Sequence, residues 1–257
     1  MKTCTLVAVQ PGLQMASRER FLALPGRAVL VGAGLLLVVV LAAIAVPAAP
    51  LAVDTQWSEA MKDIETPFLT HVALVFNALG RGLGWALSIA AVCIVLFLTQ
   101  RMLALVAFAA AEVMTSVSST VLKMLVGRPR PPDGLVHPVG SSYPSGHAAY
   151  AGATCVALVL LFTAPGPRRR WWWAAAALAT AGMAWSRTYL QVHWLSDVVG
   201  GSLLGVGVCL VVFGVAQRAG VSPRRVWRPR RRGGASPPAA QASSSARSRP
   251  MRSRTEG

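Results

Sequence analysis

Residues 141–163 read SSYPSGHAAYAGATCVALVLLFT, in which a short polar segment is followed directly by an apolar one. A helix needs roughly 20 apolar residues to cross the hydrocarbon core of a membrane, and the run at 147–163 comes close to that length. His147 stands at its first position, behind Ser145 and Gly146. The sequence therefore predicts a membrane helix with polar groups at its mouth.

Apolar runs of this kind recur along the chain. Of the 257 residues, 54% are hydrophobic and only 13% are charged, which leaves too few polar side chains to cover a water-soluble globule. We predict an all-α integral membrane bundle of six transmembrane helices, with a short interfacial helix at 67–79 between the first and second spans. The predicted spans are residues 28–49, 83–99, 102–123, 147–163, 171–186 and 195–217.

Lysine and arginine are divided unevenly between the two sides of this six-span path. With the N-terminus inside, nineteen of the 25 fall in cytoplasmic segments and six on the other face. Cytoplasmic loops are usually the basic ones, so this orientation is favoured. Counting 67–79 as a seventh span would move Arg168–Arg170 outside and remove the bias. We predict a multi-pass cell-membrane protein with both termini cytoplasmic and an uncleaved first span.

The predicted organisation has three parts: a cytoplasmic N-terminal segment (1–27), a six-span domain (28–217) and a basic cytoplasmic tail (218–257). The tail is rich in Arg, Ser and Pro and has no apolar periodicity, so we expect it to be disordered. The net charge of +16 could suit nucleic acid, but no folded nucleic-acid reader accompanies it. Membrane lipids are the expected partner, and no pattern indicates an oligomeric state.

The cysteines and two charged residues outside the main polar clusters have simpler interpretations. Cys93, Cys155 and Cys209 lie within apolar runs without disulfide or zinc spacing, and we interpret them as small buried apolar residues. Arg128 is predicted to be a solvated loop cation. Glu112 should lie near mid-membrane, and we predict a protonated or hydrogen-bonded packing role for it.

Three polar clusters break the apolar pattern, and the predicted topology puts all of them on the outer face. The first is KMLVGRPRPPD (123–133), where Lys123 ends a helix and Arg130 follows in a proline-stiffened loop. The second is the segment that leads into His147. Free N–H groups at a helix start behind Ser145 and Gly146 suit an anion such as phosphate.

The third cluster is SRTYLQVHWLSD (186–197), which contains Arg187, His193 and Asp197. His193 and Asp197 are four residues apart, so they share a face of a helix, and Asp197 can accept a hydrogen bond from one imidazole nitrogen. That bond leaves the other nitrogen free to attack a substrate. A carboxylate that has no functional role is disfavoured at the end of a membrane span.

Together the clusters supply two histidines, one carboxylate and several cations, without the group of carboxylates or cysteines that a divalent metal requires. This set fits metal-free phosphoryl transfer. Lys and Arg neutralise phosphate oxygens, one histidine attacks phosphorus, and another protonates the leaving oxygen.

The clusters resemble the three motifs of the type 2 phosphatidic acid phosphatase superfamily, membrane lipid phosphatases that are related to the vanadium haloperoxidases. Eleven fixed positions agree in identity, order and spacing, and the resemblance covers residues 123–197 closely. The motifs read Lys123, six residues, Arg130-Pro131; then Pro144-Ser145-Gly146-His147; then Ser186-Arg187, five residues, His193, three residues, Asp197.

This resemblance implies a role for each matched position. His193 would be the nucleophile that forms a phosphohistidine, and Asp197 would orient it. His147 would protonate the leaving group and then activate water. The family needs no metal or other cofactor. The phosphate would be bound by Lys123, Arg130, Ser145, Gly146 and Arg187.

The predicted function is hydrolysis of a lipid phosphomonoester or diphosphate at the extracytoplasmic face. Undecaprenyl diphosphate, phosphatidylglycerol phosphate and phosphatidic acid are the leading substrates, and the sequence does not choose among them. A lipid phosphotransferase that uses the same intermediate, and a non-catalytic lipid-phosphate binder or transporter, stay open as alternatives.

Overall fold

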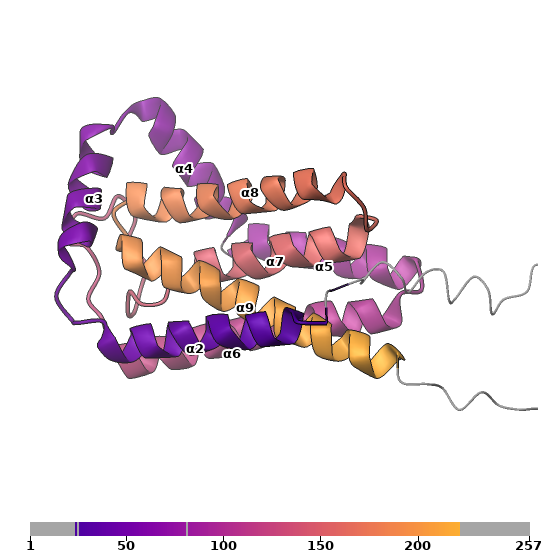
Figure 1. The fold of residues 1–257 in the computed structure, drawn as a ribbon. Helices are drawn as coiled ribbons and strands as arrows, with labels where there is room; N and C mark the ends of the chain where they lie inside the picture. The colour runs from indigo at the N-terminus through magenta and orange to yellow at the C-terminus, as the bar shows by residue number, and fades with distance from the viewer. Residues whose placement is uncertain (1–23, 25, 81, 222–257) are drawn as a thin grey trace, which may run out of the picture. The chain divides into compact units, whose positions relative to one another are not determined.

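The computed structural model describes residues 24–221 apart from residues 25 and 81, and in this part of the chain it contains eight helices and no strand (Figure 1). The all-helical class is therefore confirmed. The predicted N-terminal segment and basic tail lie almost entirely outside the described residues. The helices are α2 (Ala28–Ala45), α3 (Ala52–Asp63), α4 (Pro67–Leu79), α5 (Gly82–Leu98), α6 (Met102–Val126), α7 (Gly146–Phe162), α8 (Arg169–Tyr189) and α9 (Leu195–Val221).

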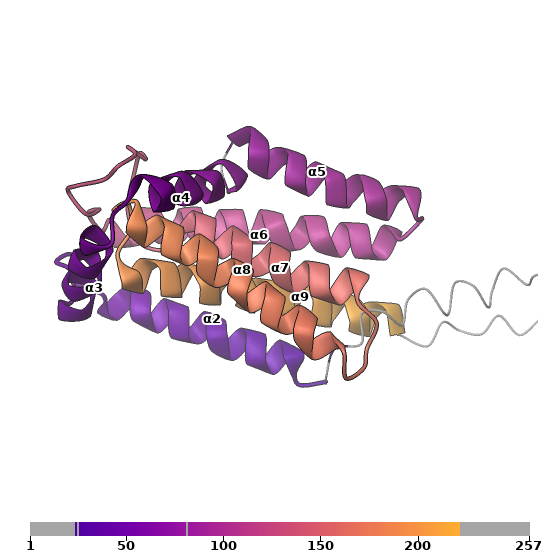
Figure 2. The same ribbon diagram turned by 90° about the horizontal axis from the view of Figure 1, so that it is seen from above.

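The helices α2, α5, α6, α7, α8 and α9 run back and forth between the two ends of a bundle, with α2 and α5 on opposite sides of it in Figure 2. Each overlaps one predicted span. Three of them, α2, α6 and α9, are long and apolar enough by themselves to cross a membrane. The pair α4 and α5 is bent by 56° and adds a fourth if it forms one broken span. The protein thus has membrane-spanning helices, while the count of six spans stays a prediction.

Two helices, and not one, separate α2 from α5. The second, α4, coincides with the predicted short helix; Pro67 occupies its first turn, and the Thr66 side chain accepts a hydrogen bond from Leu69 N at 3.2 Å. The first, α3, is missing from the prediction because its sequence AVDTQWSEAMKD is too polar for a span. Asp54 caps its first turn by accepting from Leu51 N at 3.1 Å. Whether α4 lies at the membrane interface stays a prediction.

Helix α9 lies against α2, α6, α7 and α8, and glycines let it approach α7 closely. A Cβ atom at Gly201 would lie 2.3 Å from the Ser145 carbonyl oxygen, and one at Gly205 would lie 1.9 Å from that of Ala149. Glycines four apart are typical of closely packed membrane helices, because two backbones can then come into contact. This packing places the start of α7 beside the start of α9.

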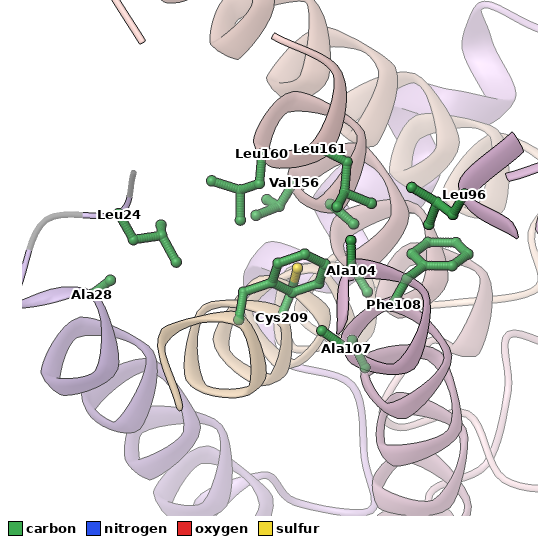
Figure 3. Close-up of a cluster of buried hydrophobic side chains, with 14 residues drawn as sticks. Leu24, Ala28, Leu96, Ala104, Ala107, Phe108, Val156, Leu160, Leu161 and Cys209 are labelled. Atoms are coloured by element: carbon green, nitrogen blue, oxygen red, sulfur yellow. The ribbon is translucent and has the colours of Figure 1, made fainter. Parts of the chain in front are cut away.

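An apolar cluster holds the opposite end of the bundle together (Figure 3). It joins the end of α5, the start of α6, the end of α7 and the second half of α9. Leu96, Phe108, Leu160 and Cys209 are completely buried in it. Cys209 therefore packs as predicted, whereas Cys93 and Cys155 are partly buried, and all three are free thiols.

Candidate active site

The three polar clusters meet at the end of the bundle that lies away from this apolar cluster. Lys123 stands in the last turn of α6, which ends at Gly127 with a left-handed φ of 62°. The start of α7 and the segment between α8 and α9 come to the same place. They surround a cavity of about 330 Å³. The predicted site residues that line it are Lys123, Arg130, Gly146, His147, Arg187 and His193.

The prediction that His193 and Asp197 share a helix face is wrong, because His193 lies in the turn before α9 and only Asp197 lies in its first turn. The two side chains nevertheless face each other, and His193 lines the cavity. The His193 Nδ1 atom lies 3.7 Å from Asp197 Oδ2 and 3.4 Å from the Ser142 hydroxyl. Ser142 and the Trp194 backbone N–H both donate to Asp197 Oδ2, the latter at 2.9 Å. The carboxylate is therefore held in one orientation toward the Nδ1 side of the ring.

The other ring nitrogen, His193 Nε2, lies 3.1 Å from Arg130 Nη1. A guanidinium can only donate hydrogen bonds, so Nε2 must accept and the ring proton belongs on Nδ1, toward Asp197. Burial lowers the pKa of His193 to about 4, and the charges of Arg130 and Lys123 act in the same direction, against Asp197. At neutral pH the ring is therefore neutral, with a lone pair on Nε2.

Three cations reach the cavity from different elements. Lys123 Nζ donates to the Ser141 carbonyl oxygen at 2.9 Å, and Arg130 donates to the Gly140 and Val192 carbonyl oxygens at 2.9 and 2.7 Å. No carboxylate within the described ranges forms an ion pair with either of these two. Their positive charge is therefore open to an anion in the cavity.

The third cation, Arg187, is held by a helix outside the motifs. Its Nη1 atom donates to the Asn77 side-chain oxygen on α4 at 2.8 Å, and its Nε atom donates to the Ser186 hydroxyl at 3.2 Å. Arg187 is almost completely buried, yet it lines the cavity. Asn77 lines the cavity as well, and its side chain positions the guanidinium.

The second motif forms the first turn of α7. Ser145 N donates to the Asp197 carbonyl oxygen at 2.9 Å, which ties the start of α7 to α9. The Ser145 side chain is completely buried and does not line the cavity, so its predicted contact with phosphate is not visible in this geometry. Gly146 and His147 do line it. The first N–H groups of an α-helix have no partner within the helix, and Gly146 and His147 are the first two residues of α7.

Helices α4 and α5 supply cavity residues that the sequence did not indicate. Gly80 lies so near to His147 that a Cβ atom there would come within 2.5 Å of the imidazole Cδ2. Trp85 and Tyr150 pack with their ring centroids 5.0 Å apart and line an apolar part of the cavity. The sequence showed a glycine, Gly80, at the end of α4, but a glycine alone does not indicate which side chain packs against it.

The prediction that Arg128 is a solvated loop cation is wrong. Its side chain is 0% exposed and forms ion pairs of 2.7 Å with both Asp54 and Asp197. Proline and neighbouring cations suggested an open loop, but α3 covers this loop.

Glu112 is buried on α6, accepts a hydrogen bond from the Thr154 hydroxyl at 2.7 Å and does not line the cavity. In the described part of the chain, no group of three or more His, Cys, Asp or Glu side chains could hold a metal ion.

Comparison with known proteins connects this geometry to a family. The family model described as the PAP2 superfamily matches residues 100–220. The matched residues make up slightly less than half of the chain. All eleven motif positions fall within the PAP2 region, whereas Asp54, Asn77, Gly80 and Trp85 lie before it. No curated protein matches the chain in sequence.

Two solved structures share the PAP2 phosphatase fold. One is a transmembrane PAP2-type phosphatidylglycerolphosphate phosphatase from Bacillus subtilis, with a TM-score of 0.65 and 25% identity over 76% of this chain and 98% of that one. The other is Aquifex aeolicus LpxE, with a TM-score of 0.51 and 22% identity over 66% of this chain and 96% of that one. Because LpxE is only 22% identical to this chain, the similarity to it is one of fold alone.

Proposed function

We propose that this protein is a membrane phosphatase that hydrolyses a lipid phosphomonoester or diphosphate through a phosphohistidine on His193. The observation that carries the proposal is the position of His193, whose Nε2 atom lies 3.1 Å from Arg130 Nη1, at a cavity that Lys123, Arg130 and Arg187 also line. A phosphate there would be bound by three cations beside a neutral nucleophile.

In the first step, His193 Nε2 attacks phosphorus and the bond from phosphorus to the leaving oxygen breaks. His147, at the same cavity, donates a proton to that oxygen. Asp197 stabilises the positive charge that develops on the imidazole, because its carboxylate faces Nδ1. Arg130 exchanges its contact with Nε2 for one with a phosphate oxygen, which frees the lone pair.

In the second step, neutral His147 accepts a proton from water while the water oxygen attacks phosphorus. The phosphorus–nitrogen bond breaks, phosphate leaves, and His193 returns to its neutral form. The backbone N–H groups at Gly146 and the three cations hold the phosphate oxygens through both steps. These steps need no metal ion, and we infer that the enzyme works without one.

Lipid phosphates are the substrate class that fits a site at the end of membrane helices. Trp85 and Tyr150 offer apolar surface beside the cations, as an amphiphilic substrate requires. The Bacillus subtilis relative is described as a phosphatidylglycerolphosphate phosphatase, which favours that substrate beside phosphatidic acid and undecaprenyl diphosphate. We place the six-span domain at 28–217, its site at the extracytoplasmic face and both termini in the cytoplasm, following the charge bias.

The test is phosphate release from these three lipids by detergent-solubilised protein in the presence of a chelator. We expect release from at least one lipid, inhibition by vanadate, and a loss of at least about 1,000-fold in His193→Ala. The control is His71→Ala, an exposed histidine whose Nδ1 atom lies 2.7 Å from the Pro67 carbonyl oxygen of its own helix. Equal activity in His193→Ala and wild type would refute the proposal, and loss of activity in chelator would refute its metal-free form.

The same experiment separates hydrolysis from the alternatives. A phosphotransferase shares the first step, but it passes the phosphoryl group to an acceptor other than water, so its product is a new phosphoester. A lipid-phosphate binder or transporter would retain lipid and release no phosphate.

A further inference from the structure

The buried ion pairs of Arg128 lie behind the candidate active site, on the far side of Asp197 from His193. Arg128 donates to Asp197 Oδ1 at 2.7 Å through one terminal nitrogen and to Asp54 Oδ2 at 2.7 Å through the other. All three side chains are completely buried. One guanidinium therefore bridges two carboxylates, one of which faces the predicted nucleophile.

Asp54 comes from α3, which precedes the PAP2 region, and it is fully bound as an anion. Its Oδ1 atom accepts from Ser196 N at 2.8 Å, and its Oδ2 atom accepts from the Ser196 hydroxyl at 2.9 Å as well as from Arg128. Ser196 directly precedes Asp197 in the first turn of α9. Asp54 thus holds the backbone at Ser196, directly before Asp197, and it also holds Arg128, the counter-ion of Asp197.

The charges explain why two carboxylates are present. A single buried guanidinium would neutralise Asp197 and weaken its attraction for the charge that develops on His193. With Asp54 added, the three groups carry a net charge of −1. The negative charge of Asp197 therefore remains available at Nδ1, while Lys123 and Arg130 oppose it from the cavity side.

We propose that Asp54 and Arg128 are positioning residues of this active site, which hold the Asp197 carboxylate toward His193 Nδ1 and keep it negatively charged. This inference rests on the proposed function for the role of His193. It assigns a task to α3, a helix without any of the family motifs. The competing view is that the bridge only ties α3 to the bundle.

The first experiment uses Asp54→Asn, which removes the charge and keeps the shape of the side chain. We expect kcat to fall about tenfold while KM changes by less than about twofold, because no phosphate contact is lost. The matched control is Glu59→Gln, an exposed carboxylate on the same helix, which should behave as wild type. Unchanged kcat in folded Asp54→Asn would overturn the proposal.

A second pair of variants separates a charge effect from a loss of anchoring. Arg128→Gln leaves two buried carboxylates without their cation, and we expect a loss larger than that of Asp54→Asn. Adding Asp54→Asn to it removes one of these anions and should restore activity about tenfold over Arg128→Gln. A purely structural bridge predicts that the double variant is no better than Arg128→Gln, and that result would overturn the proposal.

A third measurement does not depend on the substrate. Diethyl pyrocarbonate reacts with neutral imidazole, and peptide mass spectrometry reads the rate at each histidine. Asp54→Asn should slow modification of His193 at least about threefold relative to His147, because a less polarised ring is a weaker nucleophile. An unchanged ratio would overturn the proposal. If wild type hydrolyses no lipid phosphate but the ratio still falls, the proposed function fails and the positioning role stands.

Discussion

The two ends of the helix bundle are built in opposite ways. One end is closed by apolar side chains such as Leu96, Phe108 and Leu160, which pack without any hydrogen bond. The other end buries Arg128, Asp197 and their partners, and each charge there needs a specific neighbour. Apolar contacts tolerate small changes of shape, whereas a buried charge that loses its partner is strongly destabilised. The end that holds the cavity therefore depends more strongly on the exact position of each side chain.

The largest effect should follow from disturbing the glycine contact at the polar end. In Gly201→Val the new side chain would meet the Ser145 carbonyl oxygen, 2.3 Å from the Cβ position, and push the start of α7 away. We expect kcat/KM for lipid phosphate to fall at least about 100-fold, since a shift of about 1 Å in a catalytic group has that effect. Gly34→Val is the control, because nothing lies within 4 Å of a Cβ atom there. Activity near that of wild type in Gly201→Val would show that α7 and α9 are not held as described.

The next effect concerns the partner of Arg187 at the same end. Asn77→Ala removes the acceptor 2.8 Å from its guanidinium, so the cation loses its orientation toward the cavity. We expect kcat/KM to fall about tenfold, mainly through a higher KM. The control is Val75→Ala, a largely exposed residue of α4. If KM stays the same, Arg187 is positioned without α4.

A smaller effect on activity is expected from the apolar end. Phe108→Ala leaves a cavity in the apolar cluster and should lower the free energy of unfolding by about 3–5 kcal/mol. In protein that is still folded, kcat/KM should stay within about twofold, because distant sites act independently. Thermal unfolding and lipid phosphatase assays on one preparation check both statements. A large loss of kcat/KM at a temperature where the variant is folded would mean that the two ends are coupled.

The smallest effect is that of pH on the reactivity of His193. Its pKa of about 4 lies below the ordinary value, so the ring stays neutral as pH falls from 7.5 to 5.5. Its modification by diethyl pyrocarbonate should change little over this range. Free N-acetylhistidine, with an ordinary pKa of about 6.5, should lose about 90% of its neutral form. A parallel decline of both rates would show that His193 is not desolvated.

The lowered pKa of His193 also predicts how the stability of the fold changes with pH. Because the pKa of His193 is lower in the folded state, the unfolded chain binds more protons between the two pKa values. Stability should therefore decrease as pH falls from about 6.5 toward 4, and a His193→Gln variant should lack this contribution.

Several features of this protein follow from local sequence patterns. Long apolar runs require helices in a membrane, because every backbone polar group must find its partner within the segment. The second motif stands at a helix start, as predicted, whereas His193 precedes α9, so its approach to Asp197 depends on the turn that leads into that helix. The all-helical class, the approximate helix bounds and the match to the PAP2 family model could therefore be predicted from the sequence. For example, Leu195–Val221 lies within a few residues of its predicted span.

The residues that surround the motifs could not be predicted, because they come from distant parts of the chain. Arg128 and Asp54 are 74 positions apart, and Asn77 and Arg187 are 110 apart, so no local pattern could pair them. A charged residue in a proline-rich loop looks solvated until another helix covers it, as α3 does here. The sequence predicts which residues could perform phosphoryl transfer. Packing determined which partners hold them, because burial and charge pairing depend on elements that are distant in the chain.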